Sequence, residues 1–150
     1  MRYFLIDRIT RIVPGETAEG IKCVSLSDDV FEAHFPGHPI MPGALLIEAM
    51  AQLGGVLAES STQNQHALLT MIDRAKFRVM VRPGDQVKLE ATAQAIREEG
   101  AQVKAVARVD GKVVAEAELT FAFAQVTHPD SLKKRKEVLN IWLTGSAEQP

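Results

Sequence analysis

The 150-residue sequence has little of several features that define particular classes of protein. Its one cysteine, Cys23, cannot form a disulfide within the chain, which argues against a secreted disulfide scaffold. No stretch approaches the ~18 apolar residues of a membrane-spanning helix, and charges at Arg2, Asp7 and Arg8 interrupt any signal-peptide pattern. The formal net charge of −2 gives no overall attraction to nucleic acid or to an anionic membrane. We therefore expect a cytoplasmic protein with neither a nucleic-acid partner nor an integral membrane span.

What the sequence does contain is the pattern of an ordinary globular domain, with 46% apolar and 24% charged residues. The pattern predicts strands at 2–13 and 19–26, a helix from Pro42 to about Ser60, and strands at 67–81, 86–96, 101–109 and 112–126. The links of the last four strands are short, so these strands are expected to form an antiparallel meander. The result is an α+β fold with one long helix against a mainly antiparallel sheet. Residues 1–126 form the expected domain, and 127–150 a basic amphipathic extension.

The segment "HFPGHPIMPG", which begins at His34, is rich in turn-forming residues and leads directly into the predicted helix. The spacing of His34 and His38 resembles a helical zinc-binding pair, but Pro36, Gly37 and Pro39 prevent a helix from presenting both rings on one face. No nearby Cys or Asp completes a set of metal ligands, and the chain has neither a G-x-S-x-G elbow nor a phosphate-binding glycine pattern. The segment is therefore either a plain turn or part of an active site.

Three groups near the start of the predicted helix could act together: the His34 ring, the Gly43 backbone N–H and the Glu48 carboxylate. Gly43 has no side chain to cover its backbone N–H, which would lie at the positive end of the helix. Glu48 is the only acid between Glu32 and Glu59, and burying a lone carboxylate is costly unless it is paired, protonated or at a pocket wall. Taken singly, Glu48 could be a hydrogen-bonded structural residue, and His34 a loop histidine bonded to the backbone. Taken together, the three supply a base, an oxyanion donor and an acid.

The stretch "HFPGHPIMPGALLIEAMAQLGG" resembles the signature of the 3-hydroxyacyl-acyl carrier protein dehydratases, the FabZ/FabA group. "AKFRVMVRPGDQVKLEA" resembles the second marker of this family and "FLIDRI" its first strand, so the resemblance runs from about Tyr3 to Ala124. It implies the hotdog fold, in which a curved, mainly antiparallel sheet wraps one long helix. A missing "PHR" segment before the first strand and the basic C-terminal stretch depart from the pattern. They indicate a specialised member, for example in polyene, polyketide or unusual lipid synthesis.

The resemblance also implies residue roles. The family's catalytic histidine falls on His34 and its catalytic acid on Glu48, a position that holds Glu in the FabZ type and Asp in the FabA type. The glycine whose N–H binds the thioester carbonyl falls on Gly43, and Gln52 matches a helix glutamine that positions the acid or a water. His38 fills a variable position. The implied reaction is dehydration of 3-hydroxyacyl-acyl carrier protein thioesters to trans-2-enoyl thioesters in fatty acid or related acyl-chain biosynthesis, without a metal or an organic cofactor.

The implied partners are an acyl carrier protein and a second copy of the chain. In the family, one subunit of a homodimer supplies the histidine and the other the carboxylate, and dimers often assemble further as a trimer of dimers. Candidates for the wall of an acyl tunnel are Phe35, Met41, Phe77 and Met80, any of which could instead be a core residue. Candidates for docking the acidic carrier protein are Arg74, Lys76, Arg78 and Arg82, which could instead be solvated edge-strand charges.

Other functions stay open at this point. A thioesterase or another acyl-CoA enzyme can share the fold, and so can a non-catalytic acyl-binding subunit. In the extension, the basic run at 133–136 lies among apolar residues at helical spacings, such as Leu139 and Trp142. This pattern predicts a packed C-terminal helix with a charged face in solvent, a membrane-surface helix or a contact with a partner subunit.

Overall fold

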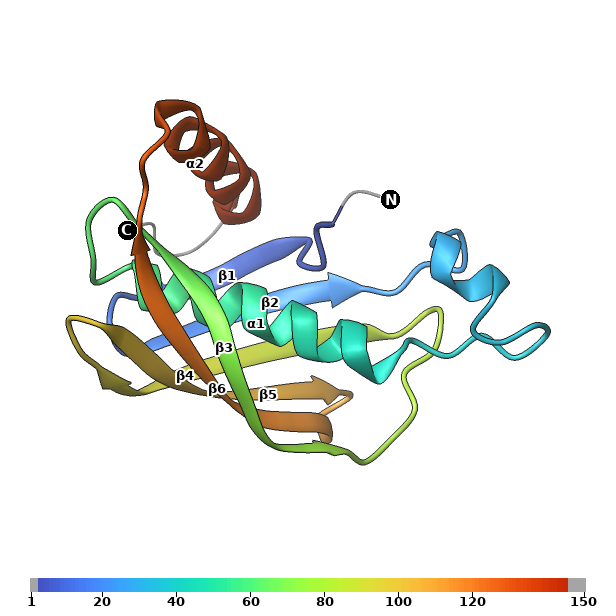
Figure 1. Cartoon of the computed structure of the whole chain (residues 1–150). Coiled ribbons are helices and arrows are strands. Elements are labelled where there is room, and N and C mark those ends of the chain that lie inside the picture. Colours follow the sequence, from blue (N-terminus) through green and yellow to red (C-terminus); the bar gives the residue numbers. More distant parts are fainter. Residues whose placement is uncertain (1–2, 146–150) are drawn as a thin grey trace.

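The computed structural model describes residues 3–145, in which six strands surround one long helix and a second helix packs outside them (Figure 1). The elements are β1 (Arg8–Val13), β2 (Thr17–Cys23), the 3-10 helix η1 (Asp29–Glu32), α1 (Gly43–Glu59), β3 (Gln65–Phe77), β4 (Gln86–Ile96), β5 (Gly100–Val109), β6 (Lys112–Gln125) and α2 (Pro129–Leu143). The outer ends of the two expected segments, residues 1–2 and 146–150, lie outside the described residues.

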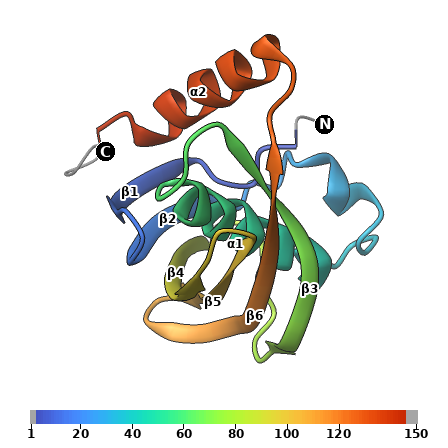
Figure 2. The same cartoon turned by 60° about the vertical axis from the view of Figure 1, so that its left-hand side comes forward.

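All six strands form one sheet in the order β1-β2-β4-β5-β6-β3, and every neighbouring pair is antiparallel. Figure 2 shows the sheet curving around α1. The predicted α+β architecture, with a mainly antiparallel sheet wrapped around one long helix, is confirmed. The helix begins at Gly43, with Pro42 as its N-cap, one residue later than the sequence predicts.

The position of β3 corrects the predicted meander. Strands β4, β5 and β6 follow one another as expected, but β3 pairs with β6 and forms the edge of the sheet. It also ends at Phe77 rather than at Val81. The reason lies in the hydrogen bonds of the next residues. The backbone N–H of Arg78 still donates to Val114 O (2.8 Å) on β6. Val81 O instead accepts from Met41 N (2.8 Å), so the chain turns from β6 toward the start of α1.

The N-terminal segment also differs from prediction, because β1 begins at Arg8 and residues 3–5 belong to no strand. These residues bond to a side chain of the central helix instead. Leu5 N donates to Gln52 Oε1 (3.0 Å), and Tyr3 O accepts from Gln52 Nε2 (3.0 Å). Regular strand pairing starts only beyond this point, where Asp7 N donates to Ile21 O (2.8 Å).

The core lies between α1 and the concave face of the sheet. Fully buried side chains include Met50, Leu53 and Leu57 from α1 and Leu89 and Leu119 from the sheet. The helix approaches the sheet closely at Gly54. A Cβ there would lie 3.3 Å from the Phe121 ring and 3.4 Å from Val103 Cγ1, tighter than ordinary packing contacts.

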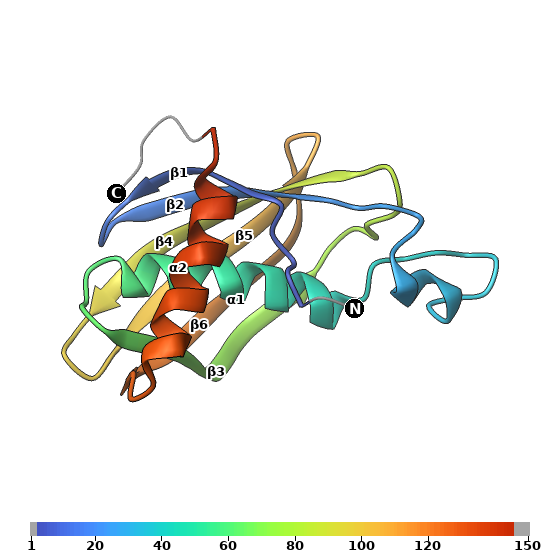
Figure 3. The same ribbon diagram turned by 90° about the horizontal axis from the view of Figure 1, so that it is seen from above.

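Helix α2 packs on the outside of this unit, above β1 and running across the direction of α1 (Figure 3). Leu143 is buried, and Leu139 and Trp142 are partly buried against the core. Arg135 donates to Glu59 Oε1 at the end of α1, while the lysines at 133, 134 and 136 are exposed. Among the described residues, no helix is long and apolar enough to cross a membrane.

Replacing Leu143 with alanine is expected to lower the free energy of unfolding by about 2–3 kcal/mol, because it removes a buried side chain and leaves a cavity. Urea denaturation measures the change. Ile141→Ala, on the same helix but 65% exposed, is the control and should change it by less than ~0.5 kcal/mol. Equal effects of the two substitutions would contradict the packing of α2 on the core.

Candidate active site

His34 is held in a single orientation by its own loop. The loop follows η1, with His34 N donating to Val30 O (3.1 Å), and it closes where Ile40 N donates to His34 O (3.0 Å). The imidazole Nδ1 lies 2.7 Å from Ile40 O. A carbonyl oxygen can only accept, so in the neutral ring Nδ1 carries the hydrogen and Nε2 keeps its lone pair. The loop therefore fixes the tautomer in which Nε2 can take a proton.

The half-buried His34 faces a cavity of about 300 Å³ beside the start of α1. Its walls come from the histidine loop, the first turn of α1 and the chain that follows β3: His34, Ile40, Met41, Gly43, Leu46 and residues 77–81. Gly43 lies against the Phe77 ring, where a Cβ would be only 2.8 Å from Cε1. Within residues 3–145, no hydrogen-bond acceptor is recorded for the Gly43 N–H, the first N–H of the helix. This donor is thus available at the positive end of α1.

Glu48 is half-buried and is not among the residues that line this cavity. At 100° per residue it lies about 140° around α1 from Gly43 and about 7 Å further along the axis. Its Oε1 accepts a hydrogen bond from Gln52 Nε2 (3.2 Å), one turn later on the same face. A single chain therefore brings His34 and Gly43 to one cavity and places the third candidate residue on another face of the helix.

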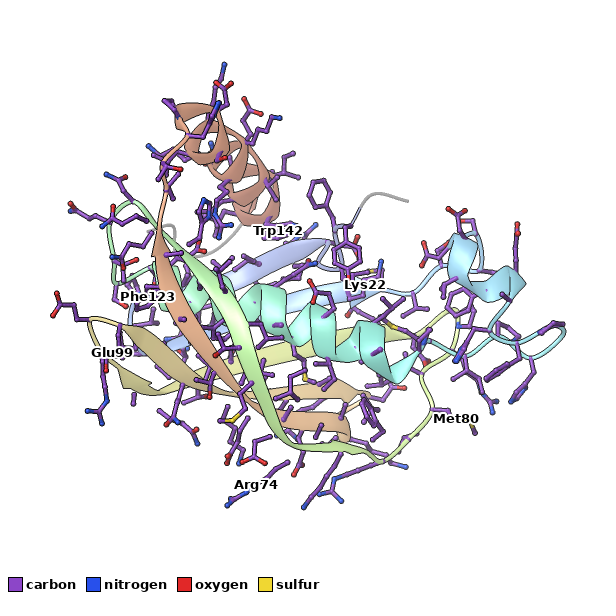
Figure 4. The ribbon with its side chains drawn as sticks, in the orientation of Figure 1. Lys22, Arg74, Met80, Glu99, Phe123 and Trp142 are labelled. Carbon is purple, nitrogen blue, oxygen red and sulfur yellow. The ribbon has the colours of Figure 1, made fainter. Side chains whose placement is uncertain are left out.

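The structure places three of the four expected tunnel residues at the cavity of His34 and one outside its lining. Met41, Phe77 and Met80 line the cavity of His34, and Figure 4 shows Met80 in the chain segment that passes the start of α1. Phe35 is not among the lining residues. Its ring stacks on the imidazole of His34, with centroids 4.0 Å apart. Met41 is 5% exposed and also belongs to the hydrophobic core. A core role was the alternative that the sequence left open for all four residues.

The four basic docking candidates are all exposed, on β3 and the loop after it. Two of them face acids on β6: Arg74 lies 3.8 Å from Glu118, and Arg78 Nη2 lies 3.3 Å from Glu116 Oε1. The hydrogen bond from Arg78 lowers the pKa of the Glu116 carboxyl. No ion pair is recorded for Lys76 or Arg82 in the described part of the chain. Arg74 has a positive φ of 51° in a bulge that bends β3.

Between Tyr3 and Gly145, no group of three or more His, Cys, Asp or Glu side chains is arranged to hold a metal ion. The polar groups that meet at the cavity are instead an imidazole and a helix-start N–H. Such a pair suits proton abstraction next to a carbonyl whose oxygen gains charge.

Comparison with known proteins decides the family. The model of the FabA-like domain matches residues 1–118. A FabZ 3-hydroxyacyl-[acyl-carrier-protein] dehydratase of Geobacter metallireducens is 45% identical over 126 residues, covering 81% of this chain and 84% of the relative. The FabZ dehydratase of Bacillus subtilis is 42% identical over 125 residues, covering 82% and 89%. The chain belongs to the FabA-like family. The resemblance to its FabZ type is thereby confirmed.

Solved structures agree on the fold of this FabA-like chain. The dehydratase heterocomplex ApeI:P from Xenorhabdus doucetiae aligns with a TM-score of 0.69 at 17% identity, covering 87% of this chain and 90% of that one. Thioesterase HI1161 from Haemophilus influenzae aligns with a TM-score of 0.63 at 15% identity, covering 80% of each chain. Dehydratases and thioesterases therefore share this backbone, and the choice between them depends on the side chains of the site.

Sequence reasoning missed several parts of the site. Leu46 and Val79 also wall the cavity. The sequence pattern predicts Val79 inside a strand. In the structure β3 ends at Phe77, and the turn of the chain after it brings Val79 to the cavity. A second cavity of about 230 Å³ also has Met41 in its wall, together with the buried Lys22. The contact of residues 3–5 with Gln52 had no signal in the sequence, because a side chain replaces a strand partner there.

Proposed function

We propose that this chain dehydrates 3-hydroxyacyl-acyl carrier protein thioesters to trans-2-enoyl thioesters, with His34 as base, Glu48 as acid and Gly43 N–H as oxyanion donor. The observation that carries the proposal is the orientation of His34. Its Nδ1 is bonded to Ile40 O, which leaves Nε2 free at a cavity shared with Gly43. The dehydratase relatives at 45% and 42% identity support the same reaction.

The reaction breaks two bonds and releases one water. His34 Nε2 takes the proton from C2, and the electron pair moves toward the thioester carbonyl. Gly43 N–H stabilises the negative charge that develops on that oxygen. Glu48 gives a proton to the C3 hydroxyl, which leaves as water as the C2–C3 double bond forms. Return of the proton from His34 to Glu48 resets the site. No step requires a metal or an organic cofactor.

A second copy of the chain completes the site in this proposal. Strand β3 is a sheet edge with exposed apolar side chains, including Leu68 (54%), Met71 (51%) and Ile72 (47%). A long apolar edge strand favours pairing with another strand, and a twofold copy is the simplest partner. The cavity of His34 is walled by residues 77–81, directly after this edge, so it lies beside the proposed interface. We expect Glu48 to reach it from the partner subunit.

One assay tests the proposed function. The protein is incubated with 3-hydroxyacyl and trans-2-enoyl carrier-protein thioesters, and the acyl groups are followed by mass spectrometry. A dehydratase removes or adds the mass of one water in the two directions. Release of free thiol with loss of the acyl group would identify a thioesterase instead. An unchanged substrate that stays bound would identify a non-catalytic acyl-binding subunit.

The proposal assigns carrier-protein docking to the exposed basic residues around the end of β3, with Arg82 as the clearest single candidate. Its backbone N–H bonds to Asp85 Oδ2 (2.9 Å), so the turn does not depend on its side chain. Arg78 is a less clear candidate, because reversing its charge would also place a new acid beside Glu116, its partner on β6.

The proposed reaction belongs to fatty acid or related acyl-chain synthesis. The single cysteine, Cys23, is exposed, which fits a reducing cytoplasm.

Arg82→Glu is expected to raise KM for carrier-bound substrate about 3- to 10-fold at low salt and to weaken the salt dependence, with kcat little changed. Steady-state kinetics at several salt concentrations measure this. Arg97→Glu is the control, because Arg97 is also exposed but follows the far end of β4. If KM responds equally to both reversals, or to neither, the basic residues near β3 are not the docking surface.

A further inference from the structure

Helix α2 begins at Pro129, beyond residue 118, where the match to the FabA-like domain ends. It nevertheless contacts the N-terminal segment that bonds to Gln52, the hydrogen-bond partner of the proposed acid. Trp142 packs edge to face against Phe4, with ring centroids 6.2 Å apart and an interplanar angle of 83°. Figure 4 shows Trp142 between α2 and the N-terminal segment. Because Trp142 is partly buried against the core, this contact belongs to a packed interface.

Phe4 lies between two residues whose backbone groups bond to Gln52 on α1. Leu5 N–H donates to Oε1, and Tyr3 O accepts from Nε2, both at 3.0 Å. A backbone N–H can only donate and a backbone carbonyl can only accept. These two bonds therefore fix which side of the Gln52 amide carries the oxygen and which the nitrogen.

The remaining N–H of Gln52 reaches the proposed acid. Nε2 donates to Glu48 Oε1 at 3.2 Å, so both N–H groups and the oxygen of the amide are engaged. The position of that N–H follows from the position of Tyr3 and Leu5. Across residues 3–145, no hydrogen bond to Glu48 Oε2 is recorded, which leaves this oxygen for the departing hydroxyl of the substrate.

We propose that α2 positions the catalytic acid: Trp142 holds Phe4, residues 3–5 hold the Gln52 amide, and the amide holds Glu48. Trp142 and Phe4 are positioning residues in this proposal, which rests on the proposed role of Glu48. Residues 3–5 are not part of any described strand, and of the three only Leu5 is buried in the core. Phe4 is 43% exposed even with Trp142 in place, and Trp142 is the one aromatic ring recorded against it among residues 3–145.

Steady-state kinetics of Trp142→Ala test the inference. We expect kcat to fall about 5- to 10-fold with KM within about 2-fold, because a displaced acid weakens the transition state and not substrate binding. Trp142→Phe, which keeps an aromatic edge, should restore most of the activity. Ile141→Ala, on the exposed side of α2, should match the wild type. Unchanged kcat in Trp142→Ala, or an equal fall in Ile141→Ala, would overturn the proposal.

A double-mutant cycle separates this route from general damage to α2. If Trp142 acts through Phe4, the double variant Phe4→Ala, Trp142→Ala should lose no more kcat than the more impaired single variant. Fully additive losses would mean that the two residues act independently and would overturn the relay.

A readout without activity keeps this inference distinct from the proposed function. In Trp142→Ala, the NMR signals of the Gln52 side-chain amide should shift, and the Leu5 amide should exchange with solvent about 10-fold faster. Core amides of β5, far from α2, should keep their exchange rates. An unperturbed Gln52 amide would overturn the relay even in an active enzyme. An inactive wild-type protein with a perturbed amide would instead count against the proposed function alone.

Discussion

His34→Ala and Glu48→Gln should each lower turnover by at least ~100-fold while the fold persists, the effect usual for a positioned base or acid. In His34→Ala, the ring whose Nδ1 is bonded to Ile40 O disappears, and with it the free Nε2 at the cavity. Glu48→Gln keeps the size of the half-buried side chain but cannot supply a proton. Activity is measured by mass on carrier-bound substrate, and folding by circular dichroism and urea denaturation.

His38→Ala is the matched control for the histidine. It lies in the same loop, its side chain is exposed, and its backbone alone bonds to Phe35 N and O. Its removal should leave turnover within about 2-fold of the wild type, as expected of an exposed surface residue. Near-normal turnover in folded His34→Ala, or an equal loss in His38→Ala, would refute the assignment of the base.

Gly43→Ala is expected to lower activity by at least ~10-fold, with the chain still folded. The new Cβ would lie 2.8 Å from Phe77 Cε1, so the ring must shift, and 3.0 Å from Cζ, which is tighter than ordinary packing. Phe77 is 53% exposed, so its ring can swing away and the fold survives, but that ring is a wall of the cavity of His34. Misplacing a thioester by about 1 Å relative to the base and the oxyanion donor can cost up to ~100-fold.

Gly55→Ala provides the control on the same helix. A Cβ at Gly55 would lie 3.7 Å from the Phe121 ring and 4.0 Å from Ala67, which are ordinary contacts. Alanine is favoured over glycine in a helix, so this variant should be active and about 0.5–1 kcal/mol more stable. Kinetics and thermal unfolding of both variants test the account. A fully active Gly43→Ala would show that the close contact with Phe77 does not shape the site.

The sequence was sufficient to predict the fold class, because hydrophobic periodicity and turn residues report directly on local structure. The predicted helix differs from α1 by one residue at its start, where Pro42 caps rather than opens it. The order of the strands within the sheet was only partly predictable. The short links of β4, β5 and β6 fix their order, but the pairing of β3 with β6 depends on a crossing that local pattern does not encode.

The site was predictable where one short motif carries it and not where distant segments meet. His34 and Gly43 are nine residues apart in the sequence, and they do line one cavity. The Gln52 amide, by contrast, is oriented by Tyr3 and Leu5, which lie 49 and 47 residues away along the chain. A contact between a side chain and a remote backbone segment produces no periodic pattern in the sequence. For the same reason, the contact of Trp142 with Phe4 could only be found in the structure.

The central claim is that one site uses His34 of one subunit and Glu48 of the other. The most direct test is to unfold His34→Ala and Glu48→Gln together in equal amounts, refold them and measure dehydration. Native mass spectrometry must confirm that mixed dimers form. A mixed dimer with shared sites contains one site with both lesions and one intact site.

With random mixing, half of the dimers are mixed and half of their sites are intact, so activity should return to about a quarter of the wild-type value. Each variant refolded alone should stay at least ~100-fold below the wild type. If every chain instead carries its own complete site, each site in the mixture keeps one lesion. A mixture that contains confirmed mixed dimers but shows no recovered activity would contradict the shared site.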